Sequence, residues 1–149
     1  MLVLFAGSGC AALIYEIVWF QLLQLIIGSS AISLGMLLGA YMGGMCLGSV
    51  ALPRMVSARR HPLQVYAWLE LGIGILGILV LFGVPYVDRI YLAGAAPGIT
   101  GIVFRGVIAA VCLLPPTILM GASLPAMARL VPTTSEGVSW LGLFYGGNI

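Results

Sequence analysis

Four long apolar stretches, separated by short polar or glycine-rich segments, dominate the pattern of hydrophobic and polar positions along the chain. A helix needs about 20 mainly apolar residues to cross the hydrocarbon core of a bilayer. The pattern therefore predicts an all-α integral membrane protein in a single helical domain. The predicted spans cover residues 2–27, 31–52, 63–87 and 102–130.

Turn-forming residues set the expected boundaries of these spans. Gly28-Ser29-Ser30 ends the first stretch, and either serine can cap the helix that follows. Pro53-Arg54 is expected to stop the second helix. Residues 88–101 are too interrupted for a span, and they predict a loop with one interfacial turn around 90–92. A partial fifth apolar stretch, 140–149, is too short to cross a bilayer, so we expect the chain to be a fragment of a longer protein.

Composition strengthens the membrane prediction. The chain is 62% hydrophobic and 7% charged, whereas a soluble domain carries about 25% charged residues. A net charge of +2 gives no basic face of the kind that binds nucleic acid. Cys10, Cys46 and Cys112 lie far apart in apolar segments without metal-ligand spacing, and we interpret them as small buried apolar side chains. No metal or cofactor is expected.

The arginines predict how the chain is oriented. Positively charged loops stay in the cytoplasm, and one side of the membrane carries more arginine than the other. This side holds Arg54, Arg59, Arg60 and Arg129, whereas the opposite side holds Arg89 and Arg105. We therefore expect the 54–62 loop and both termini to be cytoplasmic, in a bacterial inner membrane.

Small residues recur every four positions in the second span. One ridge contains Gly35, Gly39 and Gly43, and a second contains Gly44 and Gly48. Such ridges let helix backbones approach closely in lipid. We interpret them as packing surfaces of a helix enclosed by other helices; a helix that slides against its neighbours is the functional alternative. Four helices bury little surface alone, so a homo-oligomer or a larger membrane complex is expected.

Two glutamates interrupt the apolar spans. Glu16 shares a helical face with Gly9 and Ala12, and Glu70 shares one with Gly74 and Gly77, so both are expected to point inward. A charged side chain at the bilayer centre costs about 2.5–3.5 kcal/mol on insertion scales and often marks a functional site. A hydrogen bond to a neighbouring helix and a role in handling protons or cations both remain open. A contact between Glu70 and Arg129 is geometrically allowed.

The fourth span contains prolines that predict a kinked or broken helix, with Thr117 and Ser123 placed to bond freed carbonyls. Both a binding-site break and a plain kink remain open. The predicted break involves Pro115, Pro116 and Pro125. His61 stands alone in a loop, and no nucleophile–base pair is present. The chain is not expected to be an enzyme by itself.

Several blocks, in order, resemble a known family. GSGCAALIYEIVWFQLLQLIIGSS (7–30), LELGIGILG (69–77) and PPTILMGASLPAMARL (115–130) are similar to the membrane domain fused ahead of spermidine synthase-like domains in many bacterial proteins. The resemblance implies a transporter-like or anchoring domain, with a polyamine as possible ligand, in which Glu16 and the PTILMGASLP block belong to the recurring pattern. The aminopropyltransferase active site has no counterpart in this chain.

The segment 48–60 adds a second resemblance, to the cytoplasmic loop between helices two and three of major facilitator transporters, although the usual aspartate is missing. It implies that the spans form part of a major-facilitator-like half. The competing interpretation is a structural accessory subunit that packs against a larger membrane complex. Glycine ridges used inside the bundle would favour the transporter-like domain, and ridges that face outward would favour the accessory subunit.

Overall fold

The computed structural model describes residues 2–27, 30–56, 61–94, 98–129 and 142. Within these ranges the chain is helical, and no strand is present. Each helix contains a segment long and apolar enough to cross a membrane. The predicted all-α membrane fold with four spans is therefore confirmed. The helices are α1 (Leu2–Ile27), α2 (Ala31–Met55), α3 (Pro62–Gly94) and α4 (Ile99–Ala128).

The predicted helix boundaries are confirmed at some ends and wrong at others. The first span agrees with α1, and the Ser30 side chain caps α2 by accepting a hydrogen bond from the Ser33 backbone N–H at 3.2 Å. Helix α2 continues through Pro53 to Met55. The proline removes one backbone hydrogen bond, and the helix ends two residues beyond it. The predicted stop at Pro53-Arg54 is therefore wrong.

Helix α3 differs most from the sequence prediction. It runs to Gly94, so the loop predicted from residue 88 is wrong over its first seven residues. The segment of α3 that is long and apolar enough to cross a membrane ends at Gly83. Hydropathy indicates where a helix is apolar and not where it ends. The polar residues that follow the apolar span therefore predict a loop, although they belong to the helix. The next helix starts after Gly98, whose φ of +80° favours glycine.

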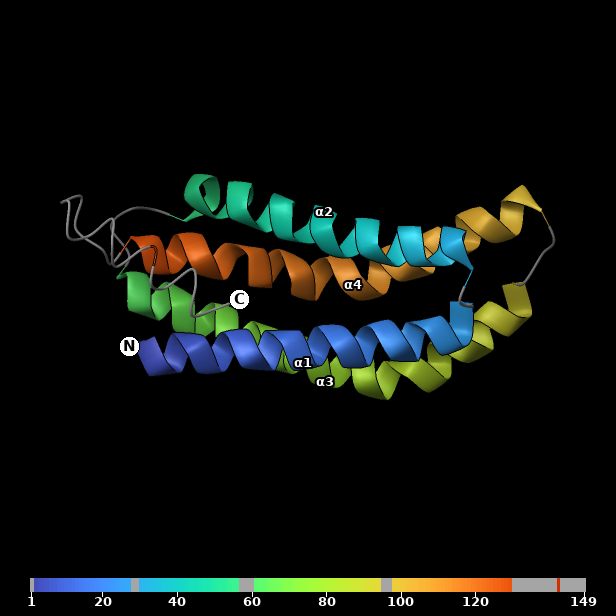
Figure 1. Cartoon of the computed structure of the whole chain (residues 1–149), viewed down its shortest axis with the longest axis horizontal. Helices are drawn as coiled ribbons and strands as arrows, with labels where there is room; N and C mark the ends of the chain where they lie inside the picture. Colours follow the sequence, from blue (N-terminus) through green and yellow to red (C-terminus); the bar gives the residue numbers. More distant parts are fainter. Residues whose placement is uncertain (1, 28–29, 57–60, 95–97, 130–141, 143–149) are drawn as a thin grey trace.

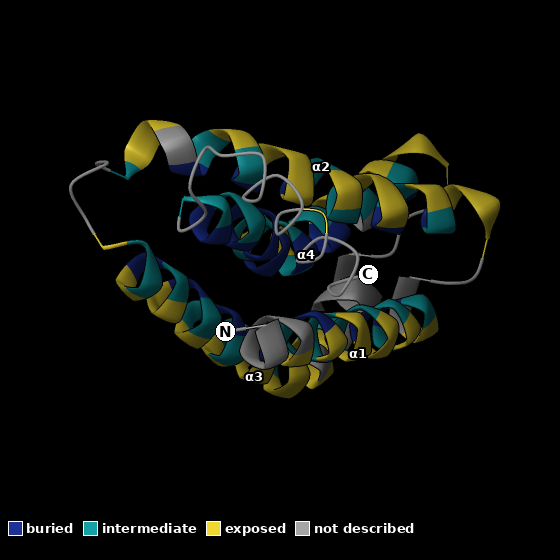
Figure 2. Cartoon of the chain, turned by 60° about the vertical axis from the view of Figure 1, so that its left-hand side comes forward, coloured by how far each residue is buried: buried dark blue, intermediate teal, exposed yellow. Residues whose placement is uncertain are grey.

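The four helices form two layers, with α2 and α4 in one and α1 and α3 in the other (Figure 1, Figure 2). The starts of α1 and α3 lie at the same end of the bundle as the ends of α2 and α4 (Figure 1). Helix α4 packs against both α2 and α3, whereas α1 packs mainly against α3. At the centre of the core, Trp19 is 1% exposed, stacks on Tyr15 and lies against Gly77.

Close backbone packing joins α2 to α4. A Cβ at Gly44 would meet the Thr117 side chain, and one at Gly48 would meet the Ile118 carbonyl. A Cβ at Gly121 would meet the Met45 backbone. These contacts confirm that the second glycine ridge of α2 packs against a neighbouring helix.

The first glycine ridge of α2 does not pack against any other part of the chain that the structure describes. The space in front of each of its glycines is open, because the ridge lies on a side of α2 that α4 does not cover. The expected enclosure of α2 by other helices is therefore observed at its second glycine ridge and not at its first, among the described residues. The glycines concerned are Gly35, Gly39 and Gly43.

The fourth helix is continuous through its prolines, so the predicted helix break is wrong; the residues are Pro115, Pro116 and Pro125. Two hydroxyls bond backbone carbonyls as expected. The Thr117 Oγ1 donates to the Leu113 carbonyl at 2.7 Å, and the Ser123 Oγ donates to the Met120 carbonyl at 2.7 Å. A proline frees the carbonyl four residues before it, and neither of these carbonyls holds that position. The hydroxyls therefore do not compensate for the bonds that the prolines remove.

Candidate functional site

A cavity of about 420 Å³ lies inside the bundle, and all four helices contribute to its wall. Most of the lining is apolar, including Ala12, Ile73 and Met120. Four hydroxyl groups interrupt the apolar surface, two of them on α2. They belong to Ser8, Tyr41, Ser49 and Ser123. An apolar cavity with a few convergent polar groups is typical of a small-molecule site.

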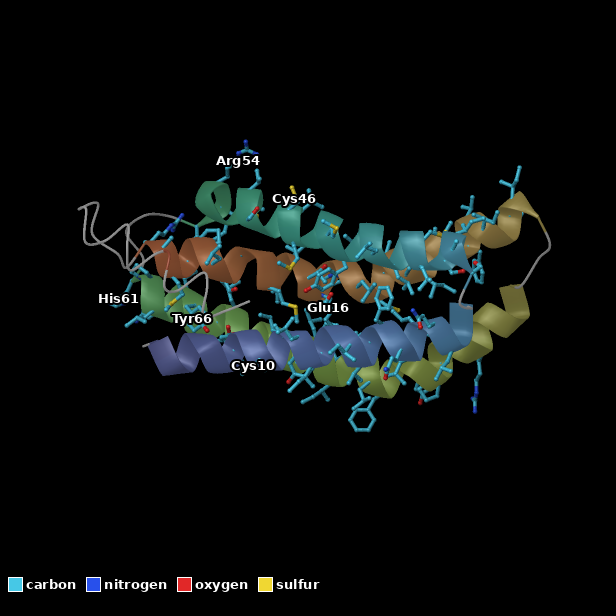
Figure 3. The ribbon with its side chains drawn as sticks, in the orientation of Figure 1. Cys10, Glu16, Cys46, Arg54, His61 and Tyr66 are labelled. Carbon is cyan, nitrogen blue, oxygen red and sulfur yellow. The ribbon has the colours of Figure 1, made fainter. Side chains whose placement is uncertain are left out.

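The first intramembrane glutamate reaches this cavity through a tyrosine. Glu16 is half-buried on α1 and points towards the layer formed by α2 and α4 (Figure 3). Its carboxyl group shares a side-chain hydrogen bond with Tyr41 of α2. Because Tyr41 lines the cavity, the carboxyl group lies directly behind its wall. The inward orientation expected from the helical face of Glu16 is the one observed.

The second glutamate reaches the same cavity through a serine. The Ser8 Oγ of α1 donates a hydrogen bond to the Glu70 Oε1 of α3 at 2.5 Å. Tyr66, one turn before Glu70, places its hydroxyl beside both Ser8 and Glu70. Figure 3 shows Tyr66 near the end of the bundle where α1 and α3 begin. Ser8 lines the cavity, so both glutamates are connected to it by a hydroxyl.

Neither glutamate has a basic partner among the side chains that the structure describes. The Arg129 Nη1 donates instead to the Val56 carbonyl at 3.3 Å, so the contact that the sequence allowed between Arg129 and Glu70 is not formed. Arg54 is exposed near the end of α2 and points away from the other helices (Figure 3). Arg59 and Arg60 lie outside the described residues. Hydroxyl groups are therefore the observed partners of both carboxyl groups.

The cysteines differ from their predicted environment. Cys10 and Cys46 are exposed and Cys112 is only partly buried, so the prediction of three buried side chains is wrong. In a bilayer an apolar side chain can face lipid and need not enter a protein core. Cys46 also lines the cavity. No group of three or more His, Cys, Asp or Glu residues that could hold a metal ion occurs in the described part of the chain.

Both glutamates are recognisable in the sequence, but the hydroxyls that bind them are not. The spacing of Tyr66 and Glu70 places them on one face of α3, and this signal could have linked the two. No sequence spacing within a single helix links Glu16 to Tyr41, or Ser8 to Glu70, because each pair joins two different helices.

Comparison with known proteins gives no relative: no protein-family model, no curated protein and no solved structure matches the chain. The resemblances to the spermidine synthase-like family and to major facilitator transporters therefore stay predictions.

Proposed function

We propose that the chain is a membrane-embedded, transporter-like domain that binds a small organic cation, such as a polyamine, in the central cavity. The observation that carries this proposal is that two intramembrane carboxyl groups stand behind one cavity, each linked to it by a hydroxyl of the wall. In the membrane an ionised carboxylate is costly and usually pairs with a cation or serves a function. A mobile cation in the cavity supplies the missing partner.

The hydrogen bonds alone do not favour function over structure, because a purely structural role also predicts a hydroxyl beside each glutamate. The cavity distinguishes a functional role of the glutamates from a purely structural one. A group that served only to join helices would be surrounded by packed side chains, whereas Tyr41 and Ser8 face open space of about 420 Å³. Helix α1 makes few contacts with α2 and α4, which leaves this side of the cavity the least constrained.

The proposed setting is a bacterial inner membrane with the 54–62 loop and both termini in the cytoplasm. Support comes from the arginines at one end of the bundle, where Arg129 contacts the end of α2. In a longer spermidine synthase-like protein the domain would also anchor the catalytic domain beside the membrane. This chain itself is assigned no catalytic residue.

A structural accessory subunit is the second candidate, and one observation favours it. The glycine ridge Gly35–Gly39–Gly43 faces open space, as expected of a helix that packs against another membrane protein. The other ridge is used inside the chain, at Gly44 and Gly48. Binding of a cation separates the candidates, because an accessory subunit needs no ligand.

The proposed function predicts that the purified protein binds spermidine and that Glu16→Gln weakens this binding about tenfold to a hundredfold. The amide keeps a hydrogen-bond acceptor for Tyr41 but loses the charge, and a hydrogen bond to a charged group contributes about 1.5–3 kcal/mol. Isothermal titration calorimetry in detergent measures the dissociation constant.

A pair of tyrosine variants supplies the matched control. Tyr41→Phe removes a hydroxyl from the cavity wall and is expected to weaken binding. Tyr86→Phe removes one from an exposed position on α3 and should leave binding unchanged. No spermidine binding by the wild-type protein, or equal binding by Glu16→Gln, would contradict the proposed function and favour the accessory subunit.

A further inference from the structure

We infer that Glu70 is a proton-binding site, separate from the cation site at Glu16, and that a cation entering the cavity expels the proton from Glu70. This inference rests on the proposed function. It assigns the two carboxyl groups different ligands, although both lie behind the same cavity.

The surroundings of Glu70 admit a proton more readily than an organic cation. Its carboxyl group receives the Ser8 hydroxyl and has the Tyr66 hydroxyl beside it, so two groups of the chain occupy it. Like Glu16, Glu70 does not line the cavity itself; Ser8 stands between Glu70 and the cavity, and the Tyr66 hydroxyl is a second group beside the carboxyl. A hydroxyl both donates and accepts hydrogen bonds. The Ser8 hydroxyl can therefore pass a proton between Glu70 and the cavity while it excludes a larger cation.

The ionisable groups around Glu70 leave its charge without a fixed partner. Tyr66 on its own helix is the titratable group that faces it. The neighbouring helix α1 carries Cys10, Tyr15 and Glu16, and none of them is a cation. At the near end of α4, Arg129 bonds the Val56 carbonyl. Among the described side chains no cation bonds Glu70, so a proton is the ligand that its closed surroundings can accept.

The proton of Glu70 is released through the Ser8 hydroxyl. Protonated Glu70 donates its proton to the Ser8 oxygen as the Ser8 hydroxyl proton passes to a cavity water, and that water gives a proton to the solvent. Glu70 is left as a carboxylate, with Ser8 as its donor in the arrangement observed. A cavity of about 420 Å³ far exceeds the roughly 10–15 Å³ that one water needs.

The two sites are close enough to influence each other. Ser8, which contacts Glu70, lies eight residues before Glu16 on α1, or roughly 12 Å along the helix. At an effective dielectric constant near 20, a unit charge at that distance changes the affinity of the other site about tenfold. A cation bound at Glu16 cancels its negative charge and so favours the ionised form of Glu70. By linkage, a proton on Glu70 weakens cation binding by the same factor.

The test is the proton release that accompanies spermidine binding, measured by titration calorimetry of the wild-type protein in buffers with different ionisation enthalpies. Wild-type protein should release protons on binding. Glu70→Gln, which resembles the protonated form, should bind spermidine up to about tenfold more weakly than wild-type protein and release severalfold fewer protons, and its affinity should vary little with pH. Glu70→Asp, which keeps the carboxyl group, should restore the release.

The outcomes separate this inference from the proposed function. If wild-type protein binds no spermidine, the proposed function fails. If it binds without releasing protons, or if Glu70→Gln releases as many, the proton site at Glu70 is refuted while cation binding stands. Should Glu70→Gln fail to fold, infrared difference spectra of the wild-type protein decide the matter. Loss of a protonated-carboxyl band on adding spermidine supports the inference, and an unchanged band overturns it.

Discussion

Leucine in place of Gly48 or Gly121 should prevent α2 and α4 from packing, and most of the protein should then fail to purify as a single species. Even the Cβ of an alanine would overlap the Ile118 carbonyl at Gly48 or the Met45 backbone at Gly121. A backbone cannot move aside without separating the two helices. Overpacking in a core typically costs about 1–3 kcal/mol, and the larger leucine should exceed that range. Size-exclusion chromatography and the thermal midpoint in mild detergent measure the effect.

Gly39→Leu on the same helix is the matched control. The space before Gly39 is open, so the substitution should leave the thermal midpoint of the isolated chain nearly unchanged. An equal loss of stability at Gly39 and Gly48 would contradict the arrangement of α2 against α4.

The second large effect is expected at Glu16, where binding should be lost while stability changes little. Glu16→Leu removes a carboxyl group whose charge costs about 2.5–3.5 kcal/mol within the membrane. It also leaves the Tyr41 hydroxyl without this partner, which costs about 1–3 kcal/mol. The two terms nearly cancel, so the leucine variant should be about as stable as wild-type protein, yet it should lose spermidine binding.

Glu16→Lys should be clearly less stable than Glu16→Leu, by roughly 2.5–3.5 kcal/mol, because it keeps the cost of a charge without a bound counterion. Thermal midpoints in detergent, compared with that of Glu16→Gln, give the order of stability. If the leucine variant proves less stable than the lysine variant, the proposed environment of Glu16 is wrong.

The sequence was sufficient for the number of helices and for most of their boundaries, because a bilayer sets the length of an apolar span. It failed at the end of α3, which stays helical to Gly94 over residues whose polar and glycine content predicts a loop. It also failed at the prolines of α4, through which the helix stays continuous.

Part of the candidate site could also be predicted. Glu16 and Glu70 stood out because carboxyl groups are rare in apolar spans. Their partners could not be read from the sequence: Ser8 lies 62 residues from Glu70, and Tyr41 is on a different helix from Glu16. The glycine ridges were visible, but which ridge packs depends on where α4 lies.

The central claim, that the cavity admits an organic cation, can be tested most directly at Cys46, which lines that cavity. In a Cys10→Ser/Cys112→Ser background, Cys46 is the sole thiol, and its reaction with a positively charged methanethiosulfonate reagent can be timed with and without spermidine. The proposed function predicts that Cys46 reacts, that spermidine slows the reaction severalfold, and that Glu16→Gln removes this protection. A thiol that does not react, or one that reacts at the same rate with spermidine present, would contradict it.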